Sequence, residues 1–585
     1  MNLRFARHYL EMVVAMMVGM LVFGAVLGAV LGAVGLDYSH AEHPAIGSLE
    51  MAFTMSLGMV AWMRYRGHGW APTLEMAAAM FAPLAVLLPL LWTGAVSGDS
   101  VMMLLHVLML PAMLAAMLRR RDEYSAAHGR GERVVRVLGR AAAVLAAFLL
   151  VPAAVYAVGA NAYEASRYTQ PEATGAAASA VAAATPPAHD PRKPTAVIVV
   201  GNGGANIADT LVPFEVLSST GAFNVYTVAP ERRPLPLLGG LDLVPDLGFA
   251  QLDQRLGGKA PDVTVVPDMP EDDAADAKVT AWLRGRASDG LLLGVCTGAR
   301  LLAEAGVLDG RDATSHWYRL PKLEEDHPEV KWRRGTRYLD DGDVITTGGL
   351  LSSVDGTLRA VERLVNADAA AAAARAVGWR HYSPGKPASL PAAELTPSNA
   401  IVHLLNLGYR SSGTTVGVLL TGGVGEIELA AAFDPYAEVK SARTLAIAAD
   451  DGSVRSRHGL TFIPRDDLDA MGRVDRLVVP GAGAAARPDA RIAAAARRAD
   501  VPVDYLHERP GFGFDAALRG MARTMDVPTA EWTGKILEYP TAGLGLSGPA
   551  WPWTLALRPL LLGLAGLAVA LVAARLVRRA RARRS

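Results

Sequence analysis

The chain contains a single cysteine, Cys296, and the residues around it suggest what chemistry it could do. Cys296 follows the apolar run Leu291–Val295, and the small residues Gly298 and Ala299 come shortly after it. This pattern predicts a strand that turns sharply into a helix with the thiol at the apex, which is the geometry of a nucleophile elbow. The start of a helix stabilises a thiolate and nearby oxyanions. We therefore expect a nucleophilic thiol, although a lone cysteine can also be a small buried apolar residue.

The sequence around this turn resembles one protein family. The resemblance lies in the segments Val295–Gly298, Ala305–Arg311, Ala313–Trp317, Asp209–Leu217 and Asp343–Gly349. Together they resemble the ThiJ/PfpI family of the class I glutamine amidotransferase-like superfamily, most closely the branch that contains isonitrile hydratase and the N-terminal domains of AraC-type regulators. The resemblance covers nearly all of the first soluble domain and none of the N-terminal apolar region.

The resemblance implies roles for four residues. Cys296 would be the nucleophile and the carboxyl group of Asp209 would lie close to the thiol, with Thr297 and His316 as neighbours. A carboxyl group beside the sulfur could move a proton in covalent catalysis or hydrogen-bond an oxidised sulfur. Two alternatives stay open: Asp209 could cap the helix that it begins, and His316 could be a buried core residue.

Two positions depart from the family pattern. Thr297 stands where PfpI-type proteases have histidine, so a protease is disfavoured. The segment that usually reads Pro-Gly-Gly is Pro267-Asp268-Met269 here. Asp268 adds negative charge and lacks the backbone freedom of glycine, so we expect an altered oxyanion pocket.

The elements that would position these residues alternate between strands and helices. Short β-branched and apolar runs predict strands at 196–200, 224–228, 263–266 and 291–295, and helices are expected at 209–218 and 274–286. This alternation favours an α/β fold with a doubly wound, flavodoxin-like parallel sheet.

The same block occurs a second time further along the chain. Asn202-Gly203-Gly204 aligns with Thr421-Gly422-Gly423, and this offset of 219 holds without a gap for some fifty residues. At the same offset, Gly240–Pro245 aligns with Gly459–Pro464. The soluble part is therefore predicted to be two tandem copies of one domain, residues 193–378 and 398–545.

The second copy lacks the cysteine. It keeps an acid, Glu428, at the Asp209 position and Pro480-Gly481 at the backbone-amide position, but the elbow is replaced by His507–Gly513. We predict a catalytically silent domain that completes an intramolecular pseudo-dimer with the first. A composite site in which Glu428 or His507 acts with Cys296 is disfavoured, because each family site is built within one domain.

The chain as a whole is too apolar for an ordinary soluble protein. Of its 585 residues 51% are hydrophobic and 19% charged, and the formal net charge is +0. Six apolar stretches are candidates to cross a bilayer, at 10–36, 46–63, 71–92, 101–118, 137–158 and 553–572, of which the second and fourth are the shortest. The balanced charge gives no reason to expect a nucleic-acid partner.

The basic residues predict the orientation of these helices. Arg4 and Arg7, Arg64 and Arg66, residues 119–140 and residues 575–584 fall on one side if the helices alternate, whereas the loops 37–45 and 93–100 contain no Lys or Arg. Positive loops stay in the cytoplasm. We predict a multi-pass protein of a bacterial-type plasma (inner) membrane with both termini cytoplasmic and residues 159–552 outside.

A Leu-Glu-Met-x-x-x-Met pattern recurs in the first three apolar stretches. It begins at Leu10, Leu49 and Leu74, and His106 with three further methionines continues a similar stripe in the fourth stretch. Thioethers and carboxylates could bind a soft metal ion. Packing of methionine between helices is the favoured interpretation, so no metal site is predicted.

These observations predict a set of segments and a function. The segments are a five-helix membrane region (1–159), an Ala/Pro/Thr-rich flexible linker (160–192), the domain with Cys296 (193–378), a linker (379–397), the degenerate copy (398–545), a membrane helix (553–572) and a basic cytoplasmic tail (573–585). The expected function is a cysteine-dependent hydratase or hydrolase that acts on an unknown small electrophile, without a cofactor. The alternative is a ligand or redox sensor, and transcription regulation is disfavoured because no DNA-binding domain is visible.

Overall fold

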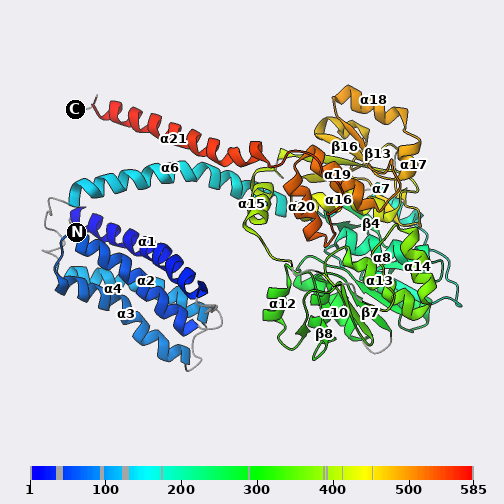
Figure 1. The fold of residues 1–585 in the computed structure, drawn as a ribbon, viewed down its shortest axis with the longest axis horizontal. Coiled ribbons are helices and arrows are strands. Elements are labelled where there is room, and N and C mark those ends of the chain that lie inside the picture. The colour runs from blue at the N-terminus through cyan, green and yellow to red at the C-terminus, as the bar shows by residue number, and fades with distance from the viewer. Residues whose placement is uncertain are drawn as a thin grey trace. The chain divides into compact units, whose positions relative to one another are not determined.

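The computed structural model describes residues 3–33, 44–92, 98–120, 131–172, 175–286, 290–386, 389–390, 393–410, 413–450 and 452–582. The chain divides into two compact units, Met1–Ala146 and Ala147–Ser585, and each unit is described by itself (Figure 1).

The first unit is helical. Its helices are α1 (Leu3–Ala33), α2 (Pro44–Tyr65), α3 (Trp70–Trp92), α4 (Gly98–Arg119) and the first half of α6 (Gly131–Glu164). The helices α1 and α2 approach closely because glycines face each other: a Cβ atom on Gly19 would lie 2.6 Å from the Cα atom of Gly58. All five predicted apolar stretches of this region are therefore helical where the structure describes them.

The methionine pattern of this unit forms its interior. Methionines from all four of the first helices are buried in one cluster: Met12, Met16, Met51, Met55, Met76, Met80, Met109, Met113 and Met117. Glu11 forms an ion pair with Arg66 at 3.3 Å, and Glu75 forms one with Arg120 at 2.7 Å. These contacts support the packing interpretation, while the side chain of His106 lies outside the described residues.

Two helices in the described part of the chain are long and apolar enough to cross a membrane, Ala146–Glu164 and Trp553–Leu576. The second lies within α21 (Trp553–Ala582). The two helices are in contact through glycine, since a Cβ atom on Gly566 would lie 2.7 Å from the carbonyl oxygen of Ala147. The number of membrane crossings and their orientation stay predictions.

The second unit contains the first soluble domain, which is built on a seven-stranded sheet in the order β10-β11-β7-β6-β1-β2-β5. The pairs are parallel except for β10 with β11. The strands are β1 (Thr195–Val199), β2 (Asn224–Ala229), β5 (Leu247–Gly248), β6 (Val263–Val266), β7 (Leu291–Gly294), β10 (Tyr338–Asp341) and β11 (Val344–Thr347). The four predicted strands and the parallel α/β fold are confirmed.

The helices of this domain follow the strands. They are α8 (Ile207–Ser219), α9 (Phe249–Leu256), α10 (Asp273–Arg284), α11 (Gly298–Glu304), α12 (Leu320–Asp326), α13 (Ser352–Leu364) and α14 (Ala367–Ala376), and a small ribbon is formed by β8 (Asp312–Ala313) and β9 (Lys331–Trp332). The helix α8 is buried along most of its length because it lies between the sheet and the second soluble domain.

The second soluble domain has a four-stranded parallel sheet in the order β13-β12-β16-β17. Its strands are β12 (Thr415–Leu420), β13 (Arg443–Ala448), β16 (Arg476–Val479) and β17 (Val503–Tyr505). Its helices are α15 (Pro397–Leu405), which continues as a π-helix (Asn406–Arg410), α16 (Glu426–Glu438), α17 (Ala482–Ala486), α18 (Ala490–Ala499), α19 (Gly513–Thr524) and α20 (Val527–Ile536), with a 3₁₀ helix at Leu468–Arg473.

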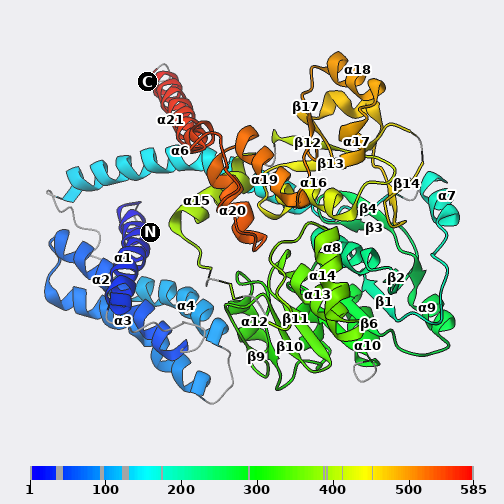
Figure 2. The ribbon, with the colours of Figure 1, turned by 45° about the vertical axis from the view of Figure 1, so that its right-hand side comes forward.

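The two soluble domains share one core and one sheet. Helices α8 and α16 lie side by side (Figure 2), and one apolar cluster contains buried residues of both domains, while a second cluster lies within the second domain. An antiparallel sheet, in the order β14-β15-β4-β3, crosses the boundary. Its strands are β3 (Leu235–Leu237), β4 (Leu241–Val244), β14 (Val454–Arg455) and β15 (Thr461–Ile463).

The segment between α6 and β1 differs from the flexible linker that we expected. The helix α6 continues to Glu164, a short helix α7 (Gly175–Ala183) follows, and the residues between them contact the soluble domains. The buried hydroxyl group of Tyr163 donates to the carbonyl oxygen of Ala437 at 2.8 Å, and the amide of Gly239 donates to the carbonyl oxygen of Arg167 at 3.1 Å. Composition suggested a flexible stalk because the aromatic and basic residues that anchor it are few.

Candidate active site

Cys296 lies at the turn between β7 and α11 with a φ angle of 55°. A positive φ is uncommon for a residue with a side chain and is typical of a nucleophile elbow. The turn is held by the amide of Cys296, which donates to the carbonyl oxygen of Gly348 at 3.1 Å. A Cβ atom on Gly298 would lie 2.0 Å from the carbonyl oxygen of Val266, so only glycine fits there. The predicted turn is confirmed.

Asp209 is fully buried in the first turn of α8. It does not cap the helix, because Asn206 is the N-cap and accepts a hydrogen bond from the amide of Asp209 at 3.0 Å. The capping alternative is therefore wrong. One carboxylate oxygen of Asp209 accepts from the amide of Asp268 at 3.2 Å, while Oδ1 has no partner of normal geometry in the described structure. The thiol of Cys296 acts as a donor that lowers the pKa of Asp209.

Burial and neighbouring charges dominate the electrostatics of the thiol. Burial raises the pKa of Cys296 well above its usual value, and the carboxyl groups of Asp209, Asp268 and Glu438 raise it further. Burial and the charge of Asp268 likewise raise the pKa of Asp209. Burial and the three acids therefore oppose the stabilisation of a thiolate that we expected from the start of α11.

Asp268, the residue that replaces glycine in the family pattern, is half-buried beside this pair. Burial and the charge of Glu438 raise the pKa of Asp268 to about 6. Its amide is occupied by the carboxylate of Asp209, at 3.2 Å. This amide is therefore not free to stabilise an oxyanion, as we expected for this departure from the pattern.

The structure brings Thr297 to the thiol but gives His316 another role. The hydroxyl oxygen of Thr297 lies 3.7 Å from Sγ of Cys296. In contrast, Nδ1 of His316 accepts from the amide of Tyr318 at 3.3 Å, and Nε2 donates to the carbonyl oxygen of Ile536 at 2.8 Å. Both ring nitrogens are therefore used by the backbone, which favours the alternative that His316 is a buried structural residue.

Two residues near the buried thiol site were not found by sequence reasoning. Cys296 is only 5% exposed. Glu438, at the end of α16 in the second domain, accepts from the side chain of Asn206 at 2.7 Å. Tyr168, from the segment after α6, lies against the loop at Gly204, where a Cβ atom would be 2.9 Å from its ring. No local pattern marks Glu438 or Tyr168, because both are more than a hundred residues from the cysteine.

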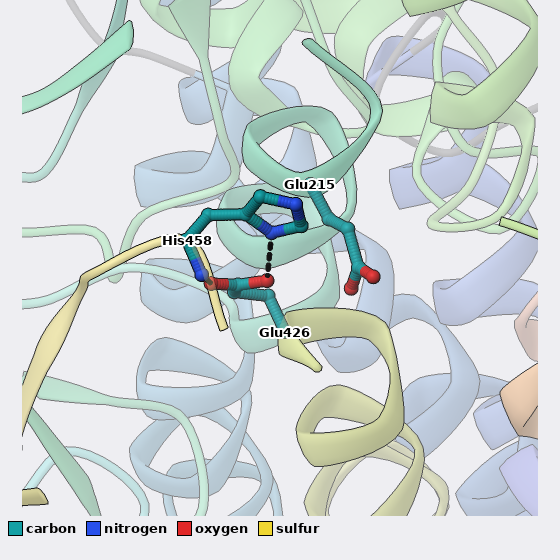
Figure 3. A group of neighbouring side chains, drawn as sticks. All are labelled: Glu215, Glu426 and His458. Atoms are coloured by element: carbon teal, nitrogen blue, oxygen red, sulfur yellow. Dashed lines mark hydrogen bonds and ion pairs between the residues drawn. The ribbon is translucent and has the colours of Figure 1, made fainter. Parts of the chain in front are cut away.

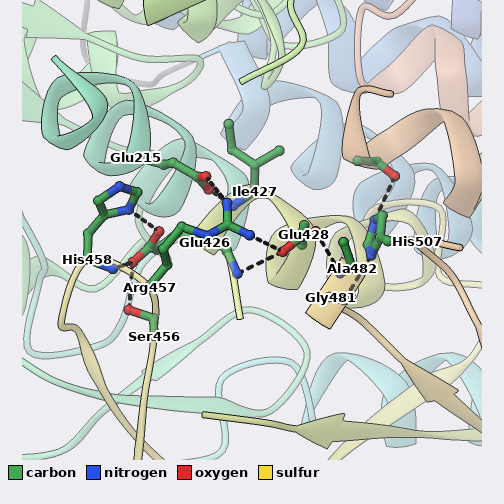
Figure 4. Close-up of polar contacts among 12 residues, drawn as sticks. Glu215, Glu426, Ile427, Glu428, Ser456, Arg457, His458, Gly481, Ala482 and His507 are labelled. Atoms are coloured by element: carbon green, nitrogen blue, oxygen red, sulfur yellow. Dashed lines mark hydrogen bonds and ion pairs between the residues drawn. The ribbon is translucent and has the colours of Figure 1, made fainter. Parts of the chain in front are cut away.

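The corresponding position of the second domain is occupied by His507 (Figure 4). Its Nδ1 accepts from the amide of Gly481 at 3.0 Å, and its Nε2 donates to the carbonyl oxygen of Gly513 at 3.2 Å. Glu428 accepts from the amide of Ala482 at 3.0 Å. The histidine is neutral and fully hydrogen-bonded, and burial lowers its pKa. Neither Glu428 nor His507 has a hydrogen bond to Cys296 among the described residues, so the composite site finds no support.

One group of side chains in the described residues has the composition of a metal site: Glu215, Glu426 and His458, whose ligand atoms lie within 4.8 Å of one another (Figure 3). Hydrogen bonds and ion pairs already occupy these groups. Nδ1 of His458 is 2.7 Å from Glu426, and Arg457 donates to Glu215 at 3.0 Å. We interpret the group as a charge-balanced contact between the two domains.

Comparison with known proteins identifies the first soluble domain. Residues 195–363 match the family model described as the DJ-1/PfpI family. These residues form a DJ-1/PfpI domain. The expected ThiJ/PfpI resemblance is thereby confirmed for this part of the chain.

Several curated relatives match this DJ-1/PfpI domain. The chain is 28% identical to isonitrile hydratase of Pseudomonas putida over 197 residues, which are 33% of this chain and 81% of that protein. It is 37% identical over 83 residues to the transcriptional regulator CdhR of Pseudomonas aeruginosa, covering 14% of this chain and 24% of the regulator. It is 29% identical over 153 residues to the regulator GlxA of Rhizobium meliloti, covering 26% and 45%. The chain thus spans less than half the length of either regulator.

Solved structures are similar to the same part of the chain. Drosophila melanogaster DJ-1beta is 21% identical with a TM-score of 0.28, covering 32% of this chain and 97% of that chain. A ThiJ/PfpI family protein from Pseudomonas syringae is 23% identical with a TM-score of 0.29, covering 34% and 83%.

Proposed function

We propose that this protein is an integral membrane protein that presents tandem DJ-1/PfpI-like domains outside the cytoplasm, and that Cys296 of the first domain is a nucleophile towards a small electrophilic molecule. The observation that carries the proposal is the elbow itself, where Cys296 has a φ of 55° and the buried Asp209 acts on its thiol. Strained backbone of this kind is retained where a side chain must be presented for chemistry.

The pair of groups suits a hydration or hydrolysis. Sγ of Cys296 bonds to the electrophilic carbon, and its proton passes through Asp209 to the atom of the substrate that gains electrons. Water then adds to the same carbon, the carbon–sulfur bond breaks, and the sulfur regains a proton. The likeness to isonitrile hydratase supports a small electrophile as the substrate class.

The second soluble domain is, in this proposal, a degenerate copy that forms a pseudo-dimer with the first. Its strand order β13-β12-β16-β17 corresponds to β2-β1-β6-β7. In the shared ribbon Leu243 pairs with Phe462, its counterpart at the offset of 219, as a two-fold axis between the copies requires. The amide of Ile427 donates to Glu215 at 2.5 Å, and Ala208 and Asp434 stand at the reciprocal positions at the same offset.

A sensor without turnover is the second candidate. Tyr168, which lies against the loop at Gly204 of the first domain, belongs to the segment that directly follows α6, so a movement of that helix would reach this loop. Oxidation of Cys296 or ligand binding would then signal through the membrane. A nucleic-acid partner is not expected, because the second α/β domain and α21 follow the DJ-1/PfpI domain.

Mass spectrometry of the intact protein tests the role of the thiol. Wild type, Cys296→Ala and Asp209→Ala are treated with peroxide and with a thiol-reactive electrophile, and the mass added is measured over time. We expect selective modification of Cys296 in the folded protein. If Cys296 reacts no faster than an ordinary buried thiol and is not oxidised, both the enzyme and the sensor are excluded.

A cysteine-accessibility experiment tests the topology. In a Cys296→Ala background, a membrane-impermeant maleimide should label Thr185→Cys in intact cells and should not label the matched variant Ser585→Cys. Thr185 is exposed in the segment before β1, so its labelling reports the side of the membrane. Labelling of Ser585→Cys alone would reverse the proposed orientation.

A further inference from the structure

A cavity of about 640 Å³ opens at the carboxyl ends of the parallel strands of the second soluble domain. It is bordered by the loop after β12 (420–424), the residues after β13 (448–450), the residues after β16 (481–484) and Arg491 of α18. Ligands of parallel α/β sheets bind at this edge, and the volume lies in the range of small-molecule sites.

In the first domain, other residues cover the loop that corresponds to the border of this cavity. The loop Gly201–Gly204 corresponds to 420–423, and its glycines are covered: a Cβ atom would meet Met269 at 2.9 Å from Gly201 and the carbonyl oxygen of Pro236 at 2.3 Å from Gly204. In the second domain, a Cβ atom on Gly422 or Gly423 would meet no described atom within 4 Å. The cavity is therefore a feature of the second domain that the shared fold does not require.

The lining of the cavity combines an apolar floor with a basic rim. Leu419, Val479 and Ile492 contribute to the floor, and the guanidinium groups of Arg455, Arg487 and Arg491 belong to the rim. Arg491 is neutralised, because it pairs with Asp450 at 2.6 Å and with Asp489 at 2.8 Å. Arg487 is exposed and has no side-chain hydrogen bond or ion pair within the described parts of the chain.

We propose that this cavity binds a small organic carboxylate with an apolar body. The planar guanidinium of Arg487 matches a carboxylate with two parallel hydrogen bonds, and Arg455 has donors left beyond its single bond to Gly459. The two acids beside Arg491 oppose a second negative charge on the ligand, which favours a monoanion. The proposed role of the cavity is binding, and His507, whose partner Gly481 lines the cavity, is tied to the backbone on both ring nitrogens.

Saturation-transfer NMR of the full chain in lipid nanodiscs tests the proposal, with benzoate as the probe and benzamide as its neutral isostere. A Cβ atom on Gly422 would meet no described atom within 4 Å, so Gly422→Phe adds a ring to the wall of the cavity, and the φ of Gly422 is not in the left-handed region. The matched control is Gly472→Phe, which also lies in open space but outside the cavity. Cys296→Ala separates this site from the proposed nucleophile.

We expect benzoate to bind wild type, Gly472→Phe and Cys296→Ala alike, to bind Arg487→Ala about tenfold more weakly, and to lose binding in Gly422→Phe. Benzamide should bind at least about tenfold more weakly than benzoate. The proposal is overturned if benzoate fails to bind wild type at about 10 mM, a weaker affinity than a built site of this kind would show. It is equally overturned if benzoate still binds Gly422→Phe or if benzamide binds as well. If Gly422→Phe unfolds, unchanged binding of benzoate by Arg487→Ala overturns the proposal instead.

Discussion

In the first soluble domain the loop after the first strand is covered by Pro236, Met269 and Tyr168, whereas in the second domain the corresponding loop borders a cavity of about 640 Å³. The cysteine, in contrast, belongs to the domain whose loop is covered. Cys296 stands at the elbow of the first domain, and His507 stands near the corresponding place in the second. The first domain thus holds a buried cysteine beside a covered loop, and the second domain has an open loop and a histidine near the corresponding place.

The two elbow positions also differ in the charges and hydrogen-bond partners around their side chains. Cys296 is surrounded by the carboxyl groups of Asp209, Asp268 and Glu438, which together with burial raise its pKa. His507 is held by hydrogen bonds to two backbone groups and carries no charge. Unfavourable charge around a buried side chain, as at Cys296, is typical of functional positions, whereas full hydrogen bonding, as at His507, is typical of structural ones.

Replacing each of these residues by alanine gives the largest expected contrast. Cys296→Ala should lose all covalent labelling by an electrophile and change the free energy of unfolding by about 1 kcal/mol or less. His507→Ala should leave the labelling of Cys296 unchanged. It should destabilise the fold by about 2 kcal/mol or more, since a buried amide and a buried carbonyl group lose their partner. Intact mass and thermal unfolding measure the two effects.

The comparison would fail if His507→Ala abolished the labelling of Cys296 in a protein that still unfolds cooperatively. A composite site would then be required. Equal stability of His507→Ala and wild type would show that the two hydrogen bonds contribute little.

The sequence predicted the parts of this contrast that depend on local patterns. Buried β-branched runs predicted β1, β2, β6 and β7 to within one residue at each end, and small residues after Cys296 predicted the elbow. A strand–turn–helix motif depends on residues that are neighbours in the chain, so it can be predicted from a single sequence. The identity of Asp209 as the buried acid came from the family resemblance, and its geometry agrees.

What could not be predicted depends on contacts between distant segments. Glu438 reaches the thiol site from the other domain, and Ile536 takes the hydrogen bond of His316. The cover by Tyr168 arises because a segment with a flexible composition is anchored at a few side chains. Such contacts are set by tertiary packing, which overrides local propensity and leaves no periodic signal.

Matched glycine substitutions measure how differently the two loops are packed. Gly204→Ala should destabilise the protein by about 3 kcal/mol or more, because the new Cβ atom would lie 2.3 Å from the carbonyl oxygen of Pro236. Gly423→Ala should cost only about 1 kcal/mol, since its φ of 77° is strained for alanine but its surroundings are open. Thermal unfolding of both variants gives the comparison, and equal losses would contradict the closed and open loops.

The contact between the domains should weaken as the pH rises. Burial and the charge of Glu426 raise the pKa of Glu215 to about 7 from its usual value of 4.5. Between these values the folded protein binds more protons than the unfolded chain, so the free energy of unfolding falls as pH increases and the loss is complete above about pH 7. Glu215→Gln, which keeps an acceptor for the amide of Ile427, should reduce this dependence by about 2 kcal/mol.

Unfolding midpoints between about pH 5 and pH 8 test this dependence. The control is Glu394→Gln, an exposed glutamate outside the group formed by Glu215, Glu426 and His458, which should behave as wild type. His458 adds to the trend: although burial would lower its pKa, the Glu426 carboxylate raises it, so its favourable charge is also lost on raising the pH. A stability that rises with pH in wild type would show that Arg457 holds Glu215 ionised.

The charge around the thiol gives the smallest and most specific test. Asp209→Asn removes a carboxyl group whose charge raises the pKa of Cys296, so the pKa of the thiol should fall and alkylation by iodoacetamide should become faster. Thr297→Val should shift the pKa the opposite way and by less, because its hydroxyl group lowers the pKa of Cys296 as a weak hydrogen-bond partner at 3.7 Å. The alkylation rate is measured from pH 6 to pH 10, with the unfolded protein as the reference for an unperturbed thiol.

Faster alkylation of Asp209→Asn together with slower oxidation or turnover would separate the acid's electrostatic effect from its role in proton transfer. An unchanged profile would mean that burial alone sets the reactivity of the first domain, and the charge contrast with His507 would lose its significance.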